Sequence, residues 1–205
     1  MPFIFKQNID SCATVGVWKI SETETELWEG LLLSEADKKA ILSLSLAKRR
    51  VERIACRKIL ALLLSQNEII IEYGPNGEPL TNGFYISFSH SAEMVAVAVS
   101  KQSLVGIDIE KIQDKIVALH PKFVSEHELT LEERNNKEAI TRVWTAKEAV
   151  YKLFAGAVPD FKAQIFVKSD KADVFLHDKT HSVKLFHWKI EEYQCTLCIR
   201  NIEDN

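Results

Sequence analysis

The chain has 205 residues, of which 46% are hydrophobic and 27% are charged, and its formal net charge is −3. This composition is typical of a globular protein, and the length suits one large domain or two small lobes. The small negative charge gives no global reason to expect a nucleic acid or a membrane as partner. Any anion-binding site must therefore arise from local clustering of basic residues.

The N-terminal segment MPFIFKQNIDSCATVG has no basic region followed by a long apolar run, so it does not predict a signal peptide. The apolar run at residues 59–64 is too short to span a bilayer. From these two features we expect a cytoplasmic protein.

The sequence contains a weak internal repeat with an offset of 90 residues. VGVWKI at 15–20 resembles VGIDIE at 105–110, and IACRKILALL at 54–63 aligns with WTAKEAVYKL at 144–153. Each half therefore reads as a strand, a long helix and several further strands, which indicates a duplicated unit.

The repeat predicts an α+β fold with two similar lobes, each a strand, a helix and an antiparallel sheet, at residues 1–102 and 103–205. The lobes are expected to form one cleft that holds the active site. The strands that follow each helix are expected at 68–73, 84–89 and 94–100 in the first half, and at 163–169, 172–177, 183–190 and 194–200 in the second.

The stretch SLAKRRVERIACRKILALLL, residues 45–64, has the strongest helical pattern in the chain. At about 100° per residue, its four arginines fall in one arc beside an apolar face. A solvated face would explain this stripe, although only Glu52 is nearby to pair with it. A polyanion site is the alternative, because guanidinium groups match phosphate geometry. The stripe consists of Arg49, Arg50, Arg53 and Arg57.

In SLVGIDIEKI, residues 103–112, Asp108 and Glu110 alternate with aliphatic residues. Successive side chains of a strand point to opposite faces, so the two carboxylates share one face. An ordinary half-exposed strand explains this pattern. A divalent cation would also explain it, because hard cations take oxygen ligands and relieve the repulsion. The second explanation requires a third ligand elsewhere in the chain.

The stretch RVWTAKEAVYKLFAG, residues 142–156, predicts a helix with Lys147 at the edge of one face and, on neighbouring positions of that face, Trp144, Glu148, Tyr151 and Lys152. The Glu148–Lys152 pair alone is an ordinary helix stabiliser worth roughly 0.2–0.5 kcal/mol. Near the C-terminus, Cys195 and Cys198 lie on a predicted strand and should point to opposite faces. We expect them, like Cys12 and Cys56, to be buried, reduced thiols.

The G-x-D-x-E strand and the later W-x-x-K-E-A-x-x-K helix together resemble the 4′-phosphopantetheinyl transferase superfamily. KFVSEHE at 122–128 resembles the aromatic-x-Ser-x-x-Glu segment of that family, and ISFSHS at 86–91 resembles its Ser-His-Ser strand end. The two-lobed length resembles the surfactin-type branch. The matching residues of the first two motifs are Gly106, Asp108, Glu110, Trp144, Lys147, Glu148, Ala149 and Lys152.

The resemblance implies an enzyme that moves the 4′-phosphopantetheine arm of coenzyme A to a serine of an acyl or peptidyl carrier protein, with Mg²⁺ as cofactor. Carried over residue by residue, it implies Mg²⁺ ligands at Asp108, Glu110 and Glu148. Lys152 would meet or protonate the leaving phosphate. The base that accepts the serine proton is Glu128, Glu148 or a metal-bound water, and the resemblance leaves these open.

The resemblance also implies where coenzyme A binds. The candidates are the basic residues Lys48, Arg49 and Arg50 for the 3′-phosphate, Ser89 and His90 for the nucleotide or its phosphates, and Lys147 as a further contact. One complete site is expected within a single chain, which predicts a monomer. The first lobe, 1–102, would bind the nucleotide of coenzyme A, and the second, 103–205, would hold the metal, carry out catalysis and dock the carrier protein. Neither a nucleic acid nor a membrane is expected as partner.

Two positions depart from the family pattern. Glu78 stands where a Gly-Lys-Pro loop often has its lysine, and Ser87 stands where an Asn is frequent. Because Glu78 would repel a phosphate, a non-catalytic or weakly active relative that binds coenzyme A or a carrier protein is an alternative. An unrelated metal-dependent phosphohydrolase is a third reading, disfavoured because such sites usually show His or further Asp clusters. The sequence does not specify which carrier protein or pathway is served.

Overall fold

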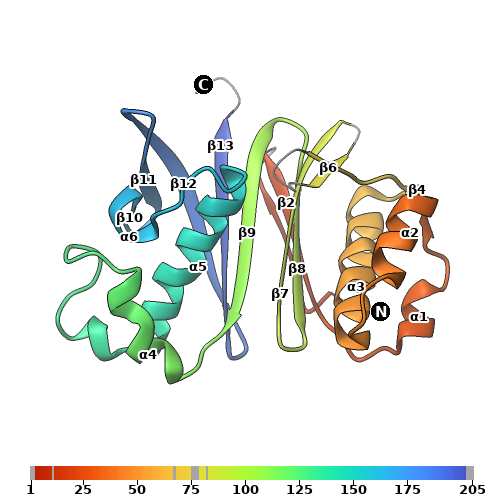
Figure 1. Cartoon of the computed structure of the whole chain (residues 1–205), viewed down its shortest axis with the longest axis horizontal. Helices are drawn as coiled ribbons and strands as arrows, with labels where there is room; N and C mark the ends of the chain where they lie inside the picture. Colours follow the sequence, from red (N-terminus) through yellow and green to blue (C-terminus); the bar gives the residue numbers. More distant parts are fainter. Residues whose placement is uncertain (1–2, 11, 67, 75–78, 82, 202–205) are drawn as a thin grey trace.

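The computed structural model describes residues 3–10, 12–66, 68–74, 79–81 and 83–201. Within these residues, two large antiparallel sheets pack face to face, and the longest helices cover their outer faces (Figure 1). The layers thus run helix, sheet, sheet, helix. This arrangement confirms the predicted α+β fold with two lobes of similar build.

The first sheet has the strand order β1-β2-β8-β7-β6-β5, and all its neighbours are antiparallel. Helix α3 packs its apolar side on the outer face of this sheet, with α1 and α2 beside it (Figure 1). A short parallel pair, β3–β4, lies outside the main sheet. The elements are β1 (Phe5–Ile9), β2 (Ala13–Lys19), α1 (Glu24–Trp28), β3 (Leu32–Leu33), α2 (Glu35–Leu42), α3 (Ala47–Leu64), β4 (Glu68–Ile69), β5 (Glu72–Tyr73), β6 (Pro79–Thr81), β7 (Phe84–Ser91) and β8 (Met94–Ser100).

The second sheet has the order β10-β11-β12-β13-β9, again antiparallel throughout, and α5 covers its outer face. The side chain of Asn136 starts α5 by accepting hydrogen bonds from the backbone N–H groups of Glu138 and Ala139. The elements are β9 (Ser103–Lys111), α4 (Lys115–Leu119), 3₁₀ turns at His120–Lys122 and Glu133–Asn135, α5 (Lys137–Leu153), α6 (Phe161–Gln164), β10 (Ile165–Val167), β11 (Lys171–Leu176), β12 (Lys179–Ile190) and β13 (Tyr193–Asn201).

The two halves repeat the same topology. In each, the strand before the long helix pairs with the last strand, and the strands between follow as a meander: β2-β8-β7-β6-β5 corresponds to β9-β13-β12-β11-β10. Helix α3 begins at Ala47 and α5 at Lys137, the 90-residue offset expected from the sequence. The division into lobes 1–102 and 103–205, with coenzyme A assigned to the first and catalysis to the second, stays a prediction.

The prediction of one continuous strand at residues 68–73 is wrong. Residues 68–73 form two short strands, because β4 pairs with β3 and β5 pairs with β6. The chain changes partner at Ile70, which is exposed, while Ile69 and Ile71 are buried. Alternating hydrophobicity marks the buried face of a strand but cannot tell which neighbouring strand it pairs with.

The core between the sheets contains apolar side chains from both halves, among them Val15, Ala96, Ile107 and Leu197. Cys195 lies in this core, whereas Cys198 lies on the α5 side of the same sheet, which confirms that the two thiols point to opposite faces. All four cysteines are free in the described part of the chain. None of its helices is both long and apolar enough to cross a bilayer.

Candidate active site

Strand β9 presents two different faces. Ile107 and Ile109 point into the core between the sheets. Gly106, Asp108 and Glu110 alternate with them and therefore face the opposite side, where α5 lies. The two carboxylates thus share one face of the strand, as predicted. This face is directed toward α5, the helix that carries the second predicted motif.

Gly106 allows α5 to approach β9 closely. A Cβ atom at this position would lie 2.0 Å from the carbonyl oxygen of Ala149, far inside van der Waals contact with backbone. Because glycine has no Cβ, the helix can lie directly against the strand. This approach brings Glu148 and Lys152, which flank Ala149 on α5, beside the carboxylate face.

Asp108 is the centre of the contacts on this face. Its Oδ1 accepts a hydrogen bond from the hydroxyl of Ser89 at 2.8 Å and another from Lys152 Nζ at 2.7 Å. Lys152 also donates to the backbone carbonyl of Ile107 at 2.9 Å. The other carboxylate oxygen, Oδ2, is buried and has no hydrogen-bond partner within the described residues. A buried, unpartnered carboxylate oxygen is costly and marks a position suited to a cation.

The two neighbouring glutamates are costly to ionise. Burial, and next the charge of Asp108, raise the pKa of Glu148 to about 7, with Glu110 adding to the shift and Lys152 opposing it. Burial and then Asp108 also raise the pKa of Glu110, against hydrogen bonds from Ser91 and Trp144. The three carboxylates therefore repel one another across a poorly solvated space.

These residues fit Mg²⁺ by the chemistry of their donors. Three carboxylates provide hard oxygen ligands, and Asp108 Oδ2 is an unused one. A bound cation would offset the repulsion that raises both glutamate pKa values. Within the described residues, however, no three His, Cys, Asp or Glu side chains are grouped closely enough to hold a metal ion.

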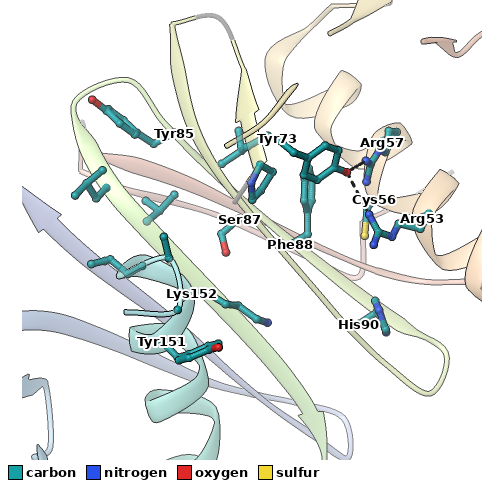
Figure 2. Close-up of a pocket in the computed structure, with 17 residues that line it drawn as sticks. Arg53, Cys56, Arg57, Tyr73, Tyr85, Ser87, Phe88, His90, Tyr151 and Lys152 are labelled. Atoms are coloured by element: carbon teal, nitrogen blue, oxygen red, sulfur yellow. Dashed lines mark hydrogen bonds between the residues drawn. The ribbon is translucent and has the colours of Figure 1, made fainter. Parts of the chain in front are cut away.

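A pocket of about 570 Å³ adjoins the carboxylates at Lys152 (Figure 2). Its volume is in the range of small-molecule sites. Figure 2 shows residues from both halves of the chain around it, with the arginines of α3 across from Tyr151 and Lys152 of α5. The polar and aromatic residues that line it include Arg53, Arg57, Tyr73, His90, Tyr151 and Lys152.

Most basic residues of the α3 stripe already have carboxylate partners. Arg50 forms hydrogen bonds with Glu24 at 3.0 and 3.1 Å and with the Leu44 carbonyl. Arg57 is buried and makes two 2.9 Å hydrogen bonds to Asp37. Arg49 shares the carboxylate of Glu52 with Lys48, which precedes the stripe: Arg49 Nη1 lies 3.1 Å from Glu52, and Lys48 Nζ lies 3.9 Å from it.

Arg53 differs from the rest of the stripe. It lines the pocket, it forms no ion pair with any described residue, and it donates a 3.2 Å hydrogen bond to the neutral hydroxyl of Tyr73. The same hydroxyl accepts from Arg57, which stacks over the ring of Phe88 at 5.2 Å. An arginine that faces a pocket without a carboxylate partner is suited to bind an anion.

Glu128 and Lys147, predicted as base and coenzyme A contact, form a buried ion pair of 2.8 Å, with side chains 2% and 0% exposed. Lys147 Nζ also donates to the carbonyls of Phe161 and Ile165. Glu128 in turn accepts from the backbone N–H groups of Ser125 and Val167. This arrangement favours a structural role for the pair, which connects α5, the segment around Glu128 and strand β10.

His90 lines the pocket, whereas Ser89 is buried against Asp108. Arg49 Nη1 lies 3.2 Å from His90 Nε2, and burial lowers the pKa of His90, which favours its neutral ring. Ser87, the departure from the frequent Asn, accepts a 3.0 Å hydrogen bond from the Ile107 N–H. Glu78, the other departure, lies outside the described residues.

Three residues of this region were not predicted from the sequence: Arg53, Tyr73 and Ser91. Arg53 was visible as part of the stripe, but nothing in the helical pattern separates it from Arg50. Ser91 was visible as the third serine of a period-two series on β7. No sequence signal identifies Tyr73, because the loop that follows it carries only turn chemistry.

Comparisons with known proteins agree with these motifs. Residues 104–198 match the sequence model of the family described as the 4′-phosphopantetheinyl transferase superfamily. Enterobactin synthase component D of Salmonella typhi is 30% identical over 142 residues, which cover 63% of this chain and 59% of that protein. The 4′-phosphopantetheinyl transferase AcpT of the same organism is 30% identical over 118 residues, which cover 53% of this chain and 61% of that protein. The chain thus spans about three fifths of the length of these relatives.

Proposed function

We propose that the protein is a phosphopantetheinyl transferase that moves the 4′-phosphopantetheine arm of coenzyme A to a serine hydroxyl of an acyl or peptidyl carrier protein, a proposal supported by the match of residues 104–198 to the sequence model of the 4′-phosphopantetheinyl transferase superfamily. The observation that carries the proposal is the junction at Lys152. This one side chain both lines the pocket and bonds to Asp108 on the carboxylate face. A phosphate donor in the pocket would therefore present its reacting group next to the carboxylates.

In the proposed reaction, the serine oxygen attacks the β-phosphorus of coenzyme A. A new P–O bond forms, the bond from that phosphorus to the bridging oxygen breaks, and 3′,5′-ADP leaves. Such reactions depend on positioning and on neutralising charge more than on covalent help. Lys152 is placed to meet the charge that develops on the leaving phosphate.

Asp108, Glu110 and Glu148 would hold Mg²⁺, which supplies charge neutralisation at the diphosphate when bound. The serine proton needs an acceptor. Glu148 stays one candidate because it lies beside Asp108, and a metal-bound water is another. The Glu148 pKa of about 7 belongs to the metal-free site and would fall when Mg²⁺ binds. Glu128 has less support because both of its oxygens already accept hydrogen bonds inside the fold.

The nucleotide of coenzyme A would occupy the pocket, with Arg53 and His90 toward its phosphates. Lys48, Arg49 and Arg50 stay candidates from the sequence, with less support because each has a carboxylate partner. A cytoplasmic location, action as a monomer and the lack of nucleic-acid and membrane partners remain predictions.

Mass spectrometry of a carrier protein incubated with the protein, coenzyme A and Mg²⁺ tests the proposal. The expected result is a mass increase of one phosphopantetheine group that requires both coenzyme A and Mg²⁺ and disappears in Asp108→Ala. Binding of coenzyme A without modification of any carrier would instead indicate a non-catalytic relative. Phosphate release that needs no carrier would indicate a phosphohydrolase.

A further inference from the structure

Strands β7 and β9 lie at the junction of the two sheets without backbone pairing between them. The backbone of β7 pairs with β6 and β8, and that of β9 pairs with β13. Serine side chains of β7 fill the gap instead. Their hydroxyl oxygens accept hydrogen bonds from successive outward N–H groups of β9: Ser87 from Ile107 at 3.0 Å, Ser89 from Ile109 at 3.2 Å and Ser91 from Lys111 at 3.2 Å. We call these three residues the serine ladder.

The spacing of the ladder follows from strand geometry. Side chains two residues apart share one face of a strand, so three serines at every second position of β7 face three alternate N–H groups of β9. Two of those amide contacts are buried, and an unpaired buried N–H costs about as much as a lost hydrogen bond. The ladder therefore satisfies donors that a neighbouring strand would normally satisfy.

A hydroxyl can accept and donate at the same time. Ser89 donates its proton to Asp108 Oδ1 at 2.8 Å, and Ser91 donates to Glu110 Oε2 at 2.7 Å. Ser87 lies level with Gly106, which has no side chain, and it contacts no carboxylate among the described residues. The ladder thus contains two members that hold a carboxylate and one that makes only the amide contact.

We propose that Ser89 and Ser91 are positioning residues that hold the carboxylates of Asp108 and Glu110 in place for the reaction, while the whole ladder joins β7 to β9. The effect on turnover rests on the proposed function; the joining of the strands does not. Each serine fixes one carboxylate oxygen from the first sheet. From the second, Lys152 of α5 donates to the same Asp108 oxygen and Trp144 of α5 hydrogen-bonds to Glu110. The orientation of the carboxylates therefore depends on both sheets.

This assignment changes the role predicted for Ser89. Its proton is donated to Asp108, and its oxygen accepts from the Ile109 N–H. Ser89 is 6% exposed as a whole residue and does not line the pocket. Ser89 therefore acts through Asp108, whereas its neighbour His90 remains the contact for the nucleotide.

Amide hydrogen exchange tests the joining of the strands without any substrate. Ser87→Ala, Ser89→Ala and Ser91→Ala should each accelerate exchange at the one matching amide, of Ile107, Ile109 or Lys111, by about 10-fold, the effect of losing one hydrogen bond. Exchange at the core amides of β13 should stay unchanged and so controls for general unfolding. Wild-type exchange at the matching amides in all three variants would overturn the ladder.

Steady-state transfer kinetics test the positioning. Ser89→Ala and Ser91→Ala should lower kcat by about 10-fold or more and leave KM for coenzyme A within about 2-fold. Ser91→Thr keeps the hydroxyl and should retain most of kcat. Ser87→Ala loses an equivalent amide contact but no carboxylate contact. Its melting temperature therefore measures the destabilisation that loss of the amide contact alone causes.

Two outcomes would overturn the positioning role: a wild-type kcat in both Ser89→Ala and Ser91→Ala, or a loss that falls only on KM. Absence of transfer by the wild-type protein would overturn the proposed function and the effect on turnover together. The exchange result would still decide whether the ladder joins the strands, so the two failures are distinguishable.

Discussion

At the residue scale, a side chain's partners decide which arginine is free to bind a ligand. Arg50 is held by Glu24 and Arg57 by Asp37, whereas Arg53 lines the pocket and, among the described residues, hydrogen-bonds to the phenol of Tyr73 without forming an ion pair. A phosphate competes poorly for a guanidinium that already has a carboxylate, because it must first break that ion pair.

Arg53→Ala should therefore weaken binding of coenzyme A by about 10-fold and binding of 3′-dephospho-coenzyme A much less. Arg50→Ala is the matched control on the same helix and should change both affinities by less. Titration calorimetry with the two ligands measures all four values. A larger, phosphate-selective loss in Arg50→Ala would restore the assignment made from the sequence.

The raised pKa of Glu148 makes the free energy of unfolding depend on pH. Its pKa is raised from 4.5 to about 7 in the folded protein, so the folded state binds the proton more tightly than the unfolded chain does. Stability then falls as the pH rises from about 4.5 through about 7, because the folded protein must ionise a buried group.

Glu148→Gln removes this cost. After allowance for partial exposure, the variant should be more stable than the wild type by about 2 kcal/mol at pH 8 and equally stable at pH 4, although it lacks transfer activity. Urea unfolding without divalent cations at the two pH values measures the difference. Equal stabilities at pH 8 would mean that Glu148 ionises freely in the fold.

Strand and helix periodicity could predict that Asp108 and Glu110 share one face and that Glu148 and Lys152 share another. That these two faces meet was implied by the resemblance to the family and not by periodicity. The sequence could not separate Arg53 from Arg50 and Arg57, since the carboxylate partners of those two lie on α1 and α2 and depend on how these helices pack. It could not show that Lys147 is buried either. That depends on carbonyls of α6 and β10, which tertiary packing brings to it.

At the element scale, the contact between β9 and α5 sets the geometry of the site. The repeat offers a comparison, because Gly16 on β2 stands 90 positions before Gly106. A Cβ at Gly16 would meet the side chains of Phe3 and Leu63, which can move, whereas one at Gly106 would meet the backbone of Ala149. The second half thus packs its helix more tightly than the first.

Gly106→Ala should force α5 away from β9 and destabilise the protein by about 3 kcal/mol, and the displaced Glu148 should cost most of the activity. Gly16→Ala should cost less in stability, because its obstacles are side chains. Chemical denaturation and transfer assays of the two variants provide the comparison. Equal losses of stability in the two variants would show that the backbone of α5 moves aside as easily as the side chain of Phe3 does.

The long elements were predictable, since α3, α5, β7 and β9 have a clear period and β8 is a continuous apolar run. The short strands β4 and β5 were not separable, because two-residue strands are defined by their partners and not by their own pattern. The residue pattern within a segment does not indicate which distant segment it pairs with.

At the scale of the whole molecule, the two sheets bury a common core. Its members come from both halves, with Val17 and Met94 on one side and Ile109 and Tyr193 on the other. Neither sheet can cover this face without the other, so the halves depend on each other for folding.

Residues 1–102 and 103–205, expressed separately, should therefore lack a cooperative thermal transition, and mixing them should restore one. Circular dichroism of the two fragments and of their mixture measures this. A fragment that melts cooperatively by itself would indicate that each half folds independently and that the shared core only docks them.

The carboxylates of β9 also bear on how the chain reaches this fold. Pairing with β13 sets Asp108 opposite Thr196 and Ile109 opposite Cys195. A slip of β9 by one residue would turn Asp108 and Glu110 into the apolar core and carry Ile107 and Ile109 out of it. Burying two unpaired charges costs far more than any hydrogen bond of the ladder returns. Asp108 and Glu110, whose burial is already unfavourable in the native site, thus destabilise the misaligned sheet even more. They therefore help to select the native register of β9 during folding.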